Sequence, residues 1–235
     1  MPHHHDHDLF AIRSVLNETA EAARSILARP EGAELAVDGI LQPLDGLPES
    51  VCDWSGVPVI VCEPGGRVSQ GGEARSEAVL SLRGGVLPED GSLSLVGRLR
   101  HAGEDFCPCC GRLREHVLVD LTAVVLERGG VQVEIDVEEF ADPALELNSG
   151  YLRCSADHLN AHHGEHLREG VAWRTTEHLD AIAAAQVASL SPSGVELRYV
   201  TVEGAHVLPL EFPEAARSAE ELADRVRWAV HPDLC

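Results

Sequence analysis

The chain has 235 residues, of which 44% are hydrophobic, and this is enough for two small domains that each bury a core. Its 39 acidic residues against 18 basic ones give a formal charge of −21, which repels a phosphate backbone and argues against a nucleic-acid partner. No apolar run approaches the roughly 18 residues that a membrane span requires, so no membrane partner is expected.

The basic residues and the cysteines restrict the chemistry further. All the basic residues are arginine, which excludes a Schiff-base lysine and a P-loop lysine, so an anionic ligand requires Arg, His or backbone amides. The opening segment MPHHHDHDLF has neither the basic nor the apolar region of a secretory signal, and we exclude it from fold reasoning. With seven cysteines and no such signal, we expect a cytoplasmic protein with reduced thiols.

The first half of the chain predicts one helix followed by strands. Apolar residues at helical spacing predict an amphipathic helix over residues 9–27. Short β-like runs follow, separated by Gly, Pro and acidic turns: ELAVDGIL, GVPVIVCE, EAVLSLRG, SLSLVGRLR, REHVLVDLTAVVLE and VQVEIDVEEF. The Gly129–Gly130 pair between the last two predicts a hairpin. We therefore predict a small antiparallel barrel over residues 9–145.

Within this half, the segment FCPCCGR resembles one zinc knuckle. Cys107 and Cys110 have C-x-x-C spacing, and His101 and His116 flank the segment. A structural zinc site normally has two such knuckles, and the chain has no second C-x-x-C. Zinc binding at Cys107 and Cys110 and a loop of reduced thiols therefore remain as two interpretations.

The second half predicts a small α+β domain over residues 152–232. ADPALELNSG indicates a linker or a short connecting helix before it. Helical patterns cover residues 157–173 and 176–185, and QVASLSPSGVELRYVTVEGAHVLPLEF predicts a three-stranded meander. A final helix over residues 218–230 opens with the capping box SAEE. The predicted fold class is thus α+β, with a barrel followed by two helices, a meander and a closing helix.

Histidines crowd the first of these predicted helices, in SADHLNAHHGEHLREGVAW. His158, His162 and His166 recur every four residues and share one stripe, while His163 and Asn160 point elsewhere. Such a stripe is either a ligand wall or a solvated helix face, and the spacing alone leaves both open.

This element order and two motifs resemble the haem iron utilisation (HugZ-like) family. HLNAHH matches the family's helix signature at His158, Asn160 and His163, and PLEFPEAARSAEEL matches its later segment. One departure is His162, where the family usually has an acidic residue. The N-terminal half, with SLSLVGRLR, is similar in element order to the FMN-binding split barrel of pyridoxamine-phosphate-oxidase-like proteins. It has no visible cluster of Arg, Lys and Ser to hold an FMN phosphate.

The resemblance implies a haem-binding protein that degrades, senses or carries haem, and a homodimer. It implies His158 as the leading axial ligand of the iron, followed by His163, with His231 near the chain end as a second ligand. The remaining candidate cofactor-binding residues are His162, Arg153 and Arg168, the two arginines as partners of the propionates. The alternatives are a flavin-dependent oxidoreductase that uses the barrel, and a non-catalytic metal-binding or regulatory module. The candidate metal ligands of that module are His158, His163, Cys107 and Cys110.

Overall fold

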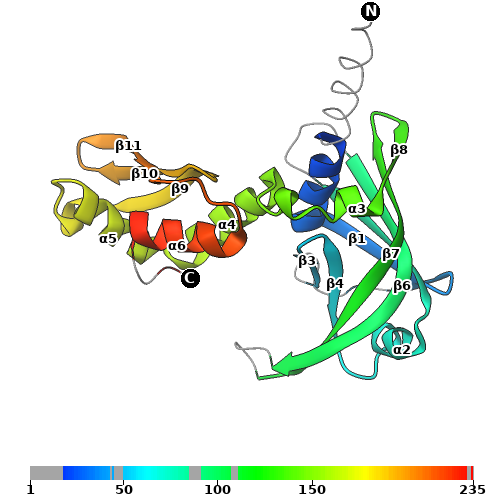
Figure 1. Ribbon diagram of the computed structural model, residues 1–235. Helices are drawn as coiled ribbons and strands as arrows, with labels where there is room; N and C mark the ends of the chain where they lie inside the picture. The colour runs from blue at the N-terminus through cyan, green and yellow to red at the C-terminus, as the bar shows by residue number, and fades with distance from the viewer. Residues whose placement is uncertain are drawn as a thin grey trace, which may run out of the picture. The chain divides into compact units, whose positions relative to one another are not determined.

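The computed structural model describes residues 18–42, 44, 50–84, 91–106, 111–231 and 234 (Figure 1). The chain divides into two compact units, Met1–Gly150 and Tyr151–Cys235. No helix among the described residues is long and apolar enough to cross a membrane.

The first unit is an antiparallel sheet preceded by a helix. The helix is described over residues 18–28, and the predicted turns before it lie outside the described residues. The strands hydrogen-bond in the order β2-β1-β5-β6-β7-β4-β3. β8 also pairs with β7, at Val124–Arg128, beyond the residues that pair with β4. This arrangement confirms the predicted split-barrel-like sheet. The strands are β1 (Pro30–Val37), β2 (Ile40–Gln42), β3 (Val51–Trp54), β4 (Val57–Cys62), β5 (Glu77–Gly84), β6 (Gly91–Phe106), β7 (Leu113–Arg128) and β8 (Val131–Ile135).

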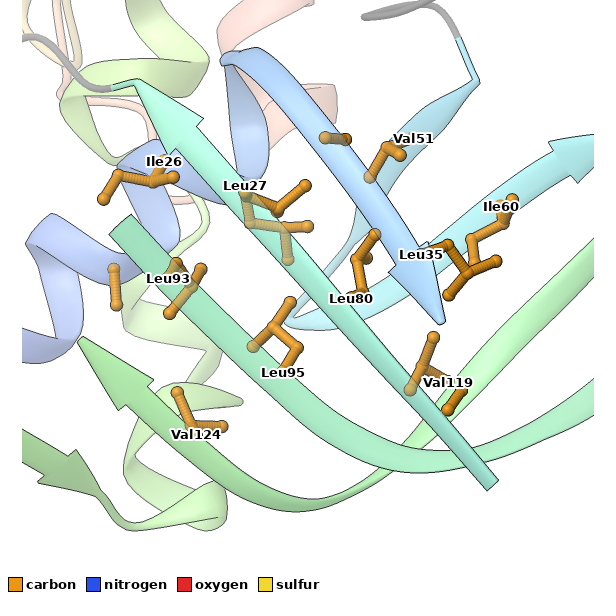
Figure 2. Packing of buried hydrophobic residues seen from close by; sticks show 14 of the residues in the cluster. Ile26, Leu27, Leu35, Val51, Ile60, Leu80, Leu93, Leu95, Val119 and Val124 are labelled. Carbon is orange, nitrogen blue, oxygen red and sulfur yellow. The ribbon is translucent and has the colours of Figure 1, made fainter. Parts of the chain in front are cut away.

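Strand alternation places the core of this unit on one face of the sheet. Inward side chains such as Leu80, Leu93 and Leu95 are fully buried, and their neighbours along each strand are more exposed. The helix over residues 18–28 adds Ile26 and Leu27 to the same cluster (Figure 2). Burial along these strands therefore follows the period-two alternation of strands with one buried face.

Two elements of this unit are absent from the sequence prediction, α2 (Arg67–Ala74) and β3. The sequence of α2, RVSQGGEA, contains two adjacent glycines, which lower intrinsic helix propensity. In the structure those glycines allow close packing. A Cβ at Gly71 would lie 2.9 Å from Leu99 Cδ1, and one at Gly72 would lie 3.2 Å from the His101 backbone nitrogen. The contact with β6 therefore requires Gly71 and Gly72, the two residues whose low helix propensity argues against a helix in the sequence.

The predicted strand VQVEIDVEEF is wrong in its second half. β8 ends at Ile135, and α3 (Val137–Phe140) follows. Asp136 is the N-cap of α3, since its Oδ1 accepts hydrogen bonds from the backbone N–H groups of Glu138 and Glu139 at 2.8 and 3.3 Å. A 3₁₀ turn, η1 (Pro143–Leu145), completes the predicted connecting segment.

The second unit has the predicted meander and closing helix. Strands β9 (Ala184–Ser191), β10 (Gly194–Thr201) and β11 (Gly204–Glu211) form an antiparallel sheet, with α5 (Gly164–Arg174) and α6 (Ala219–Ala229) along one side (Figure 1). The side chain of Ser218 caps α6 by accepting a hydrogen bond from the Glu221 N–H at 3.2 Å. The described residues thus confirm an α+β fold with a barrel-like sheet and a small α+β region.

Two helix predictions in this unit need correction. The helix predicted over residues 157–173 is two helices, α4 (Ser149–His162) and α5, and the first begins eight residues earlier than predicted. The helix predicted over residues 176–185 is only a 3₁₀ turn, η2 (Leu179–Ala181), before β9. Arg168 of α5 binds the backbone carbonyls of Leu179 and Ile182. These carbonyls therefore have a tertiary partner where a longer helix would have paired them internally.

Candidate functional site

The junction of α4 and α5 carries four histidines of the second unit, His158, His162, His163 and His166. His163 lies at the break with φ −123° and ψ 23°, outside regular helical geometry, and Gly164 begins α5. The backbone of His163 still links the two helices. Its N–H donates to the Leu159 carbonyl and its carbonyl accepts from the Leu167 N–H, both at 2.9 Å. Its ring lies 5.4 Å from that of His158 and 5.7 Å from that of His166, so the prediction that His163 points away from these histidines is wrong.

Five imidazoles form a continuous histidine row, made of His162, His158, His163, His166 and His231. In this order, successive ring centroids are 4.9, 5.4, 5.7 and 5.2 Å apart. The Nδ1 atoms of His163 and His166 are 3.4 Å apart, close enough for one to donate to the other. The row combines α4, the helix break, α5 and the segment that follows α6.

The exposure of the row changes along its length. His158 and His162 are exposed, whereas His163, His166 and His231 are partly buried. Burial lowers the pKa of His163 below its ordinary value of 6.5, and the charges of the neighbouring imidazoles lower it further. At neutral pH His163 is therefore held in the uncharged form that binds metals.

A carboxylate joins the row at its partly buried end. Glu169 Oε2 lies 3.3 Å from His231 Nε2. One donor atom from each of His166, Glu169 and His231 falls within 4.8 Å of the others. His166 belongs to the predicted histidine stripe, whereas Glu169 was not predicted, although the i, i+3 spacing of the two on one helix was a usable signal.

Asn160, in the family-like motif HLNAHH, has a structural role. Its Nδ2 donates to the Val187 carbonyl at 3.0 Å, and its Oδ1 accepts from the Val187 N–H at 2.7 Å. The side-chain amide thus pairs with the edge strand β9 as a neighbouring strand would.

The two predicted propionate partners differ in their contacts. Arg168 donates through Nε to Ile182 O at 2.8 Å and through Nη1 to Glu165 at 2.7 Å, so much of its donor capacity already holds η2 and α5 in place. Arg153 is exposed, and its Nε lies 3.7 Å from Asp157. Their pairing with propionates stays a prediction.

The predicted zinc ligands Cys107 and Cys110 lie outside the described residues. Of the two flanking histidines, His116 stacks on Trp54 at 5.3 Å and has its Nε2 3.2 Å from Asp105 Oδ1. His101 Nε2 lies 3.9 Å from Glu115 Oε2. Both histidines therefore face carboxylates within the described part of the barrel, and zinc binding by the cysteines stays a prediction.

Cys62 on β4 is expected to react with an alkylating reagent more slowly than the exposed Cys154. Burial, together with the neighbouring charge of Glu115, raises the pKa of its thiol to about 11. The thiolate is the nucleophile, so at pH 8 only a very small fraction of Cys62 is reactive. A time course of iodoacetamide labelling, read by peptide mass spectrometry, is expected to show Cys62 lagging behind the exposed Cys154. Equal rates for the two peptides would contradict this expectation.

Comparison with known proteins gives only distant structural likenesses. No family model and no curated protein matches the chain. A heme binding protein from Mycobacterium smegmatis is 16% identical over 89% of this chain and 95% of its own, with a TM-score of 0.40. Atu2129 from Agrobacterium tumefaciens, of unknown function, is 18% identical over 90% of this chain and 94% of its own, with a TM-score of 0.39.

A third solved structure is similar to about half of the chain. It is a Clostridium acetobutylicum protein related to general stress protein 26 of the pyridoxinephosphate oxidase family, 12% identical, with a TM-score of 0.36. The alignment covers 54% of this chain and 97% of that one. With TM-scores this low, these likenesses carry no argument about what the chain binds.

Proposed function

We propose that the protein binds haem through the exposed end of the histidine row, with His158 as the axial ligand of the iron. The observation that carries this proposal is the cluster of imidazoles at the end of α4, where helical spacing sets His162 beside His158 and the break at His163 adds a third ring, 5.4 Å from that of His158. His158 is exposed, so a macrocycle reaches it without opening the core.

The donor chemistry of these residues fits haem iron. Haem iron in proteins commonly takes a neutral imidazole, and a second imidazole is available on either side of His158. Arg153, one turn before Asp157 on α4, is the exposed cation proposed for a propionate. Bound haem supplies an iron centre whose reactivity depends on its axial ligand and surroundings. The role proposed for this chain is to hold and orient the haem, as a carrier or sensor of haem does.

Titration of the purified protein with haemin is expected to give a saturable Soret shift near one haem per chain. Because an imidazole would bind the iron, His158→Ala is expected to weaken binding at least tenfold or to abolish it, and His163→Ala to weaken it less. The matched control is His178→Ala, since His178 is an exposed histidine of the same unit that pairs with Asp180 outside the row.

The N-terminal histidines require a second control. A variant with His3, His4, His5 and His7 all replaced by alanine is expected to keep the shift. If wild type shows no saturable shift, or if His158→Ala binds haemin as wild type does, the proposed ligand is wrong. If haemin does bind, adding a reductant in air to the saturated protein tests whether the haem is also degraded.

The alternative function, a flavin-dependent oxidoreductase, would use the barrel. A groove of about 330 Å³ lies on this unit, lined by residues that include Ala36, Glu77, Val79, Val96, Arg98 and Thr122. Arg98 is the cation in its lining and Glu77 opposes it in charge, whereas a flavin phosphate favours several cations or amides. Flavin absorbance in the purified protein, lost in Arg98→Ala, would favour this alternative.

Two further expectations remain proposals. The homodimer is tested by light scattering on the eluted protein, where a mass near twice 25.3 kDa is expected. The cytoplasmic location is tested by fractionation of cells that express the protein.

A further inference from the structure

We infer that His166, Glu169 and His231 form a binding site for a divalent first-row transition metal, separate from the proposed haem ligand. Their donor atoms lie within 4.8 Å of one another, and the pair formed by Glu169 Oε2 and His231 Nε2 is 3.3 Å apart. The inference does not rest on haem binding, because His158 and His162 are not part of this site.

The chain builds this site from two distant segments. His166 and Glu169 are three residues apart on α5, so they lie on the same side of the helix. His231 follows α6, whose C-cap is Val230. A Cβ at Gly170 would lie 2.8 Å from both Val230 Cγ1 and Val230 O, so the absence of a side chain at Gly170 lets the chain end approach α5.

The position of His231 is anchored on both sides. Val230 is fully buried, and its N–H donates to the Val226 carbonyl at 2.8 Å. On the other side, the Leu234 N–H donates to the His231 carbonyl at 3.2 Å, and the Leu234 side chain is also buried. These contacts hold the imidazole of His231 beside Glu169.

The donor set is suited to zinc, iron(II) or cobalt(II). Two imidazoles and one carboxylate occur as the protein ligands of zinc enzymes and of non-haem iron(II) sites. With metal–ligand bonds of about 2.0–2.1 Å, neighbouring N and O ligands lie about 3.3 Å apart. The Glu169–His231 distance already has this value, and the His166 donor, within 4.8 Å of the other two, would close on the metal as it binds.

His163 orients the first ligand. The contact between the Nδ1 atoms of His163 and His166, at 3.4 Å, occupies that side of the His166 ring and leaves Nε2 for the metal. The Glu169 side chain is 37% exposed and that of His231 is 19% exposed, so water can fill the remaining coordination positions. An open site of this kind suits an exchangeable or reactive metal rather than a closed structural one.

Cobalt(II) titration of the full chain tests the site, because cobalt absorbs visible light and reports its ligands. The background protein has His3, His4, His5 and His7 replaced by alanine, which removes the other histidine-rich segment. One Co²⁺ per chain is expected to bind with visible bands and without the near-ultraviolet charge-transfer band of thiolate ligation. Appearance of that charge-transfer band would assign the metal to cysteines and overturn the inference.

The ligand assignment is tested by isosteric and matched variants. Glu169→Gln is expected to weaken Co²⁺ binding at least tenfold, and His231→Ala to remove the visible bands. Glu165→Gln, one turn earlier on α5 and exposed beside Arg168, is expected to bind as the background protein does. Equal affinity in Glu169→Gln and Glu165→Gln would overturn the site.

Haemin titration of Glu169→Gln separates the two proposals. Unchanged haemin binding with lost Co²⁺ binding supports two sites. If Glu169→Gln and His158→Ala each abolish the binding of both haemin and Co²⁺, the row is one site and the separate metal site is wrong. If Co²⁺ binding survives in a protein that never binds haemin, the metal site stands without the proposed function.

Discussion

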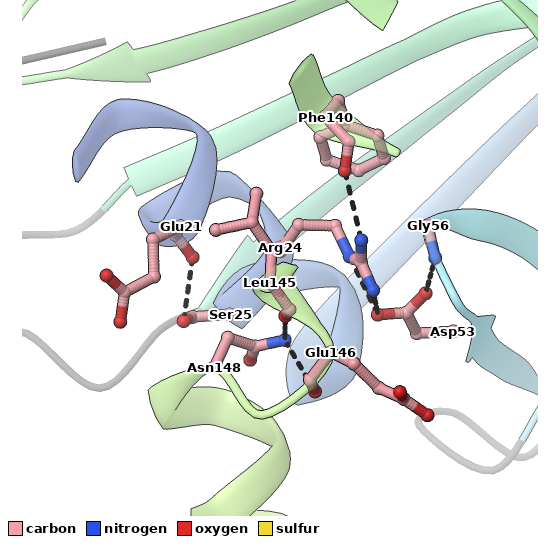
Figure 3. Close-up of polar contacts among 9 residues, drawn as sticks. All are labelled: Glu21, Arg24, Ser25, Asp53, Gly56, Phe140, Leu145, Glu146 and Asn148. Carbon is pink, nitrogen blue, oxygen red and sulfur yellow. Dashed lines mark hydrogen bonds and ion pairs between the residues drawn. The ribbon is translucent and has the colours of Figure 1, made fainter. Parts of the chain in front are cut away.

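Replacing Arg24 with methionine is expected to destabilise the first unit by about 3–5 kcal/mol, the cost typical of breaking a buried ion pair from one side. Arg24 is fully buried on the helix over residues 18–28. Its Nε donates to Asp53 Oδ2 at 2.9 Å, and its Nη1 donates to the Phe140 carbonyl at 3.0 Å (Figure 3). One guanidinium therefore joins the first helix, β3 and α3.

The expected loss comes mainly from Asp53, which would remain buried without its cation. Only 7% of the Asp53 side chain is exposed. Burial raises the pKa of this carboxyl, while Arg24 and the Gly56 N–H oppose the rise. Removing Arg24 raises the pKa further. The folded variant then holds a proton that the unfolded chain releases, so its stability falls as pH rises through the carboxyl range.

Urea denaturation, followed by circular dichroism, measures this change in the free energy of unfolding. The deficit of Arg24→Met relative to wild type is expected to widen between about pH 4 and pH 7. Arg83→Met is the matched control, because Arg83 and Glu34 form an exposed pair at 3.6 Å that is worth about 0–1 kcal/mol. The double variant Arg24→Met/Asp53→Leu is expected to recover much of the loss. A loss below about 1 kcal/mol in Arg24→Met would show that the ion pair is not structural.

The second large effect is expected from Gly170→Val in the small unit. The new side chain would collide with Val230, whose carbonyl and Cγ1 both lie 2.8 Å from the Cβ position. Overpacking of this kind costs about 1–3 kcal/mol, and relief requires the segment after α6 to move away from α5. His231 moves with that segment, so Co²⁺ affinity is expected to fall at least tenfold while haemin binding at His158 persists.

Gly164→Ala provides the matched control for this substitution. Gly164 opens the same helix, and a Cβ there meets nothing within 4 Å. Thermal unfolding and Co²⁺ titration of the two variants are expected to show a loss in Gly170→Val alone. If Gly170→Val keeps wild-type Co²⁺ affinity, close packing of Val230 does not position His231.

Local sequence patterns were sufficient for much of the fold. β5 matches the predicted strand EAVLSLRG residue for residue, because its alternation reflects one buried and one exposed face. Gly129 and Gly130 form the predicted hairpin turn with φ of 57° and 77°, a conformation that glycine adopts without strain. Ser218 caps the last helix as predicted, since capping involves residues only three apart.

The helix lengths and the candidate site were decided by tertiary contacts. Contacts with residues far away in the chain override local propensity in both directions. α2 forms despite its glycines because they allow close packing. The helix predicted over residues 176–185 does not form, and Arg168 binds the Ile182 carbonyl in that segment. The crowding of imidazoles near residue 160 is visible in the sequence. The helix break at His163 and the contact of His231 with Glu169 are visible in the folded chain alone. A local pattern specifies which face of one element is buried, whereas a site depends on which elements pack together, as Gly170 and Val230 do.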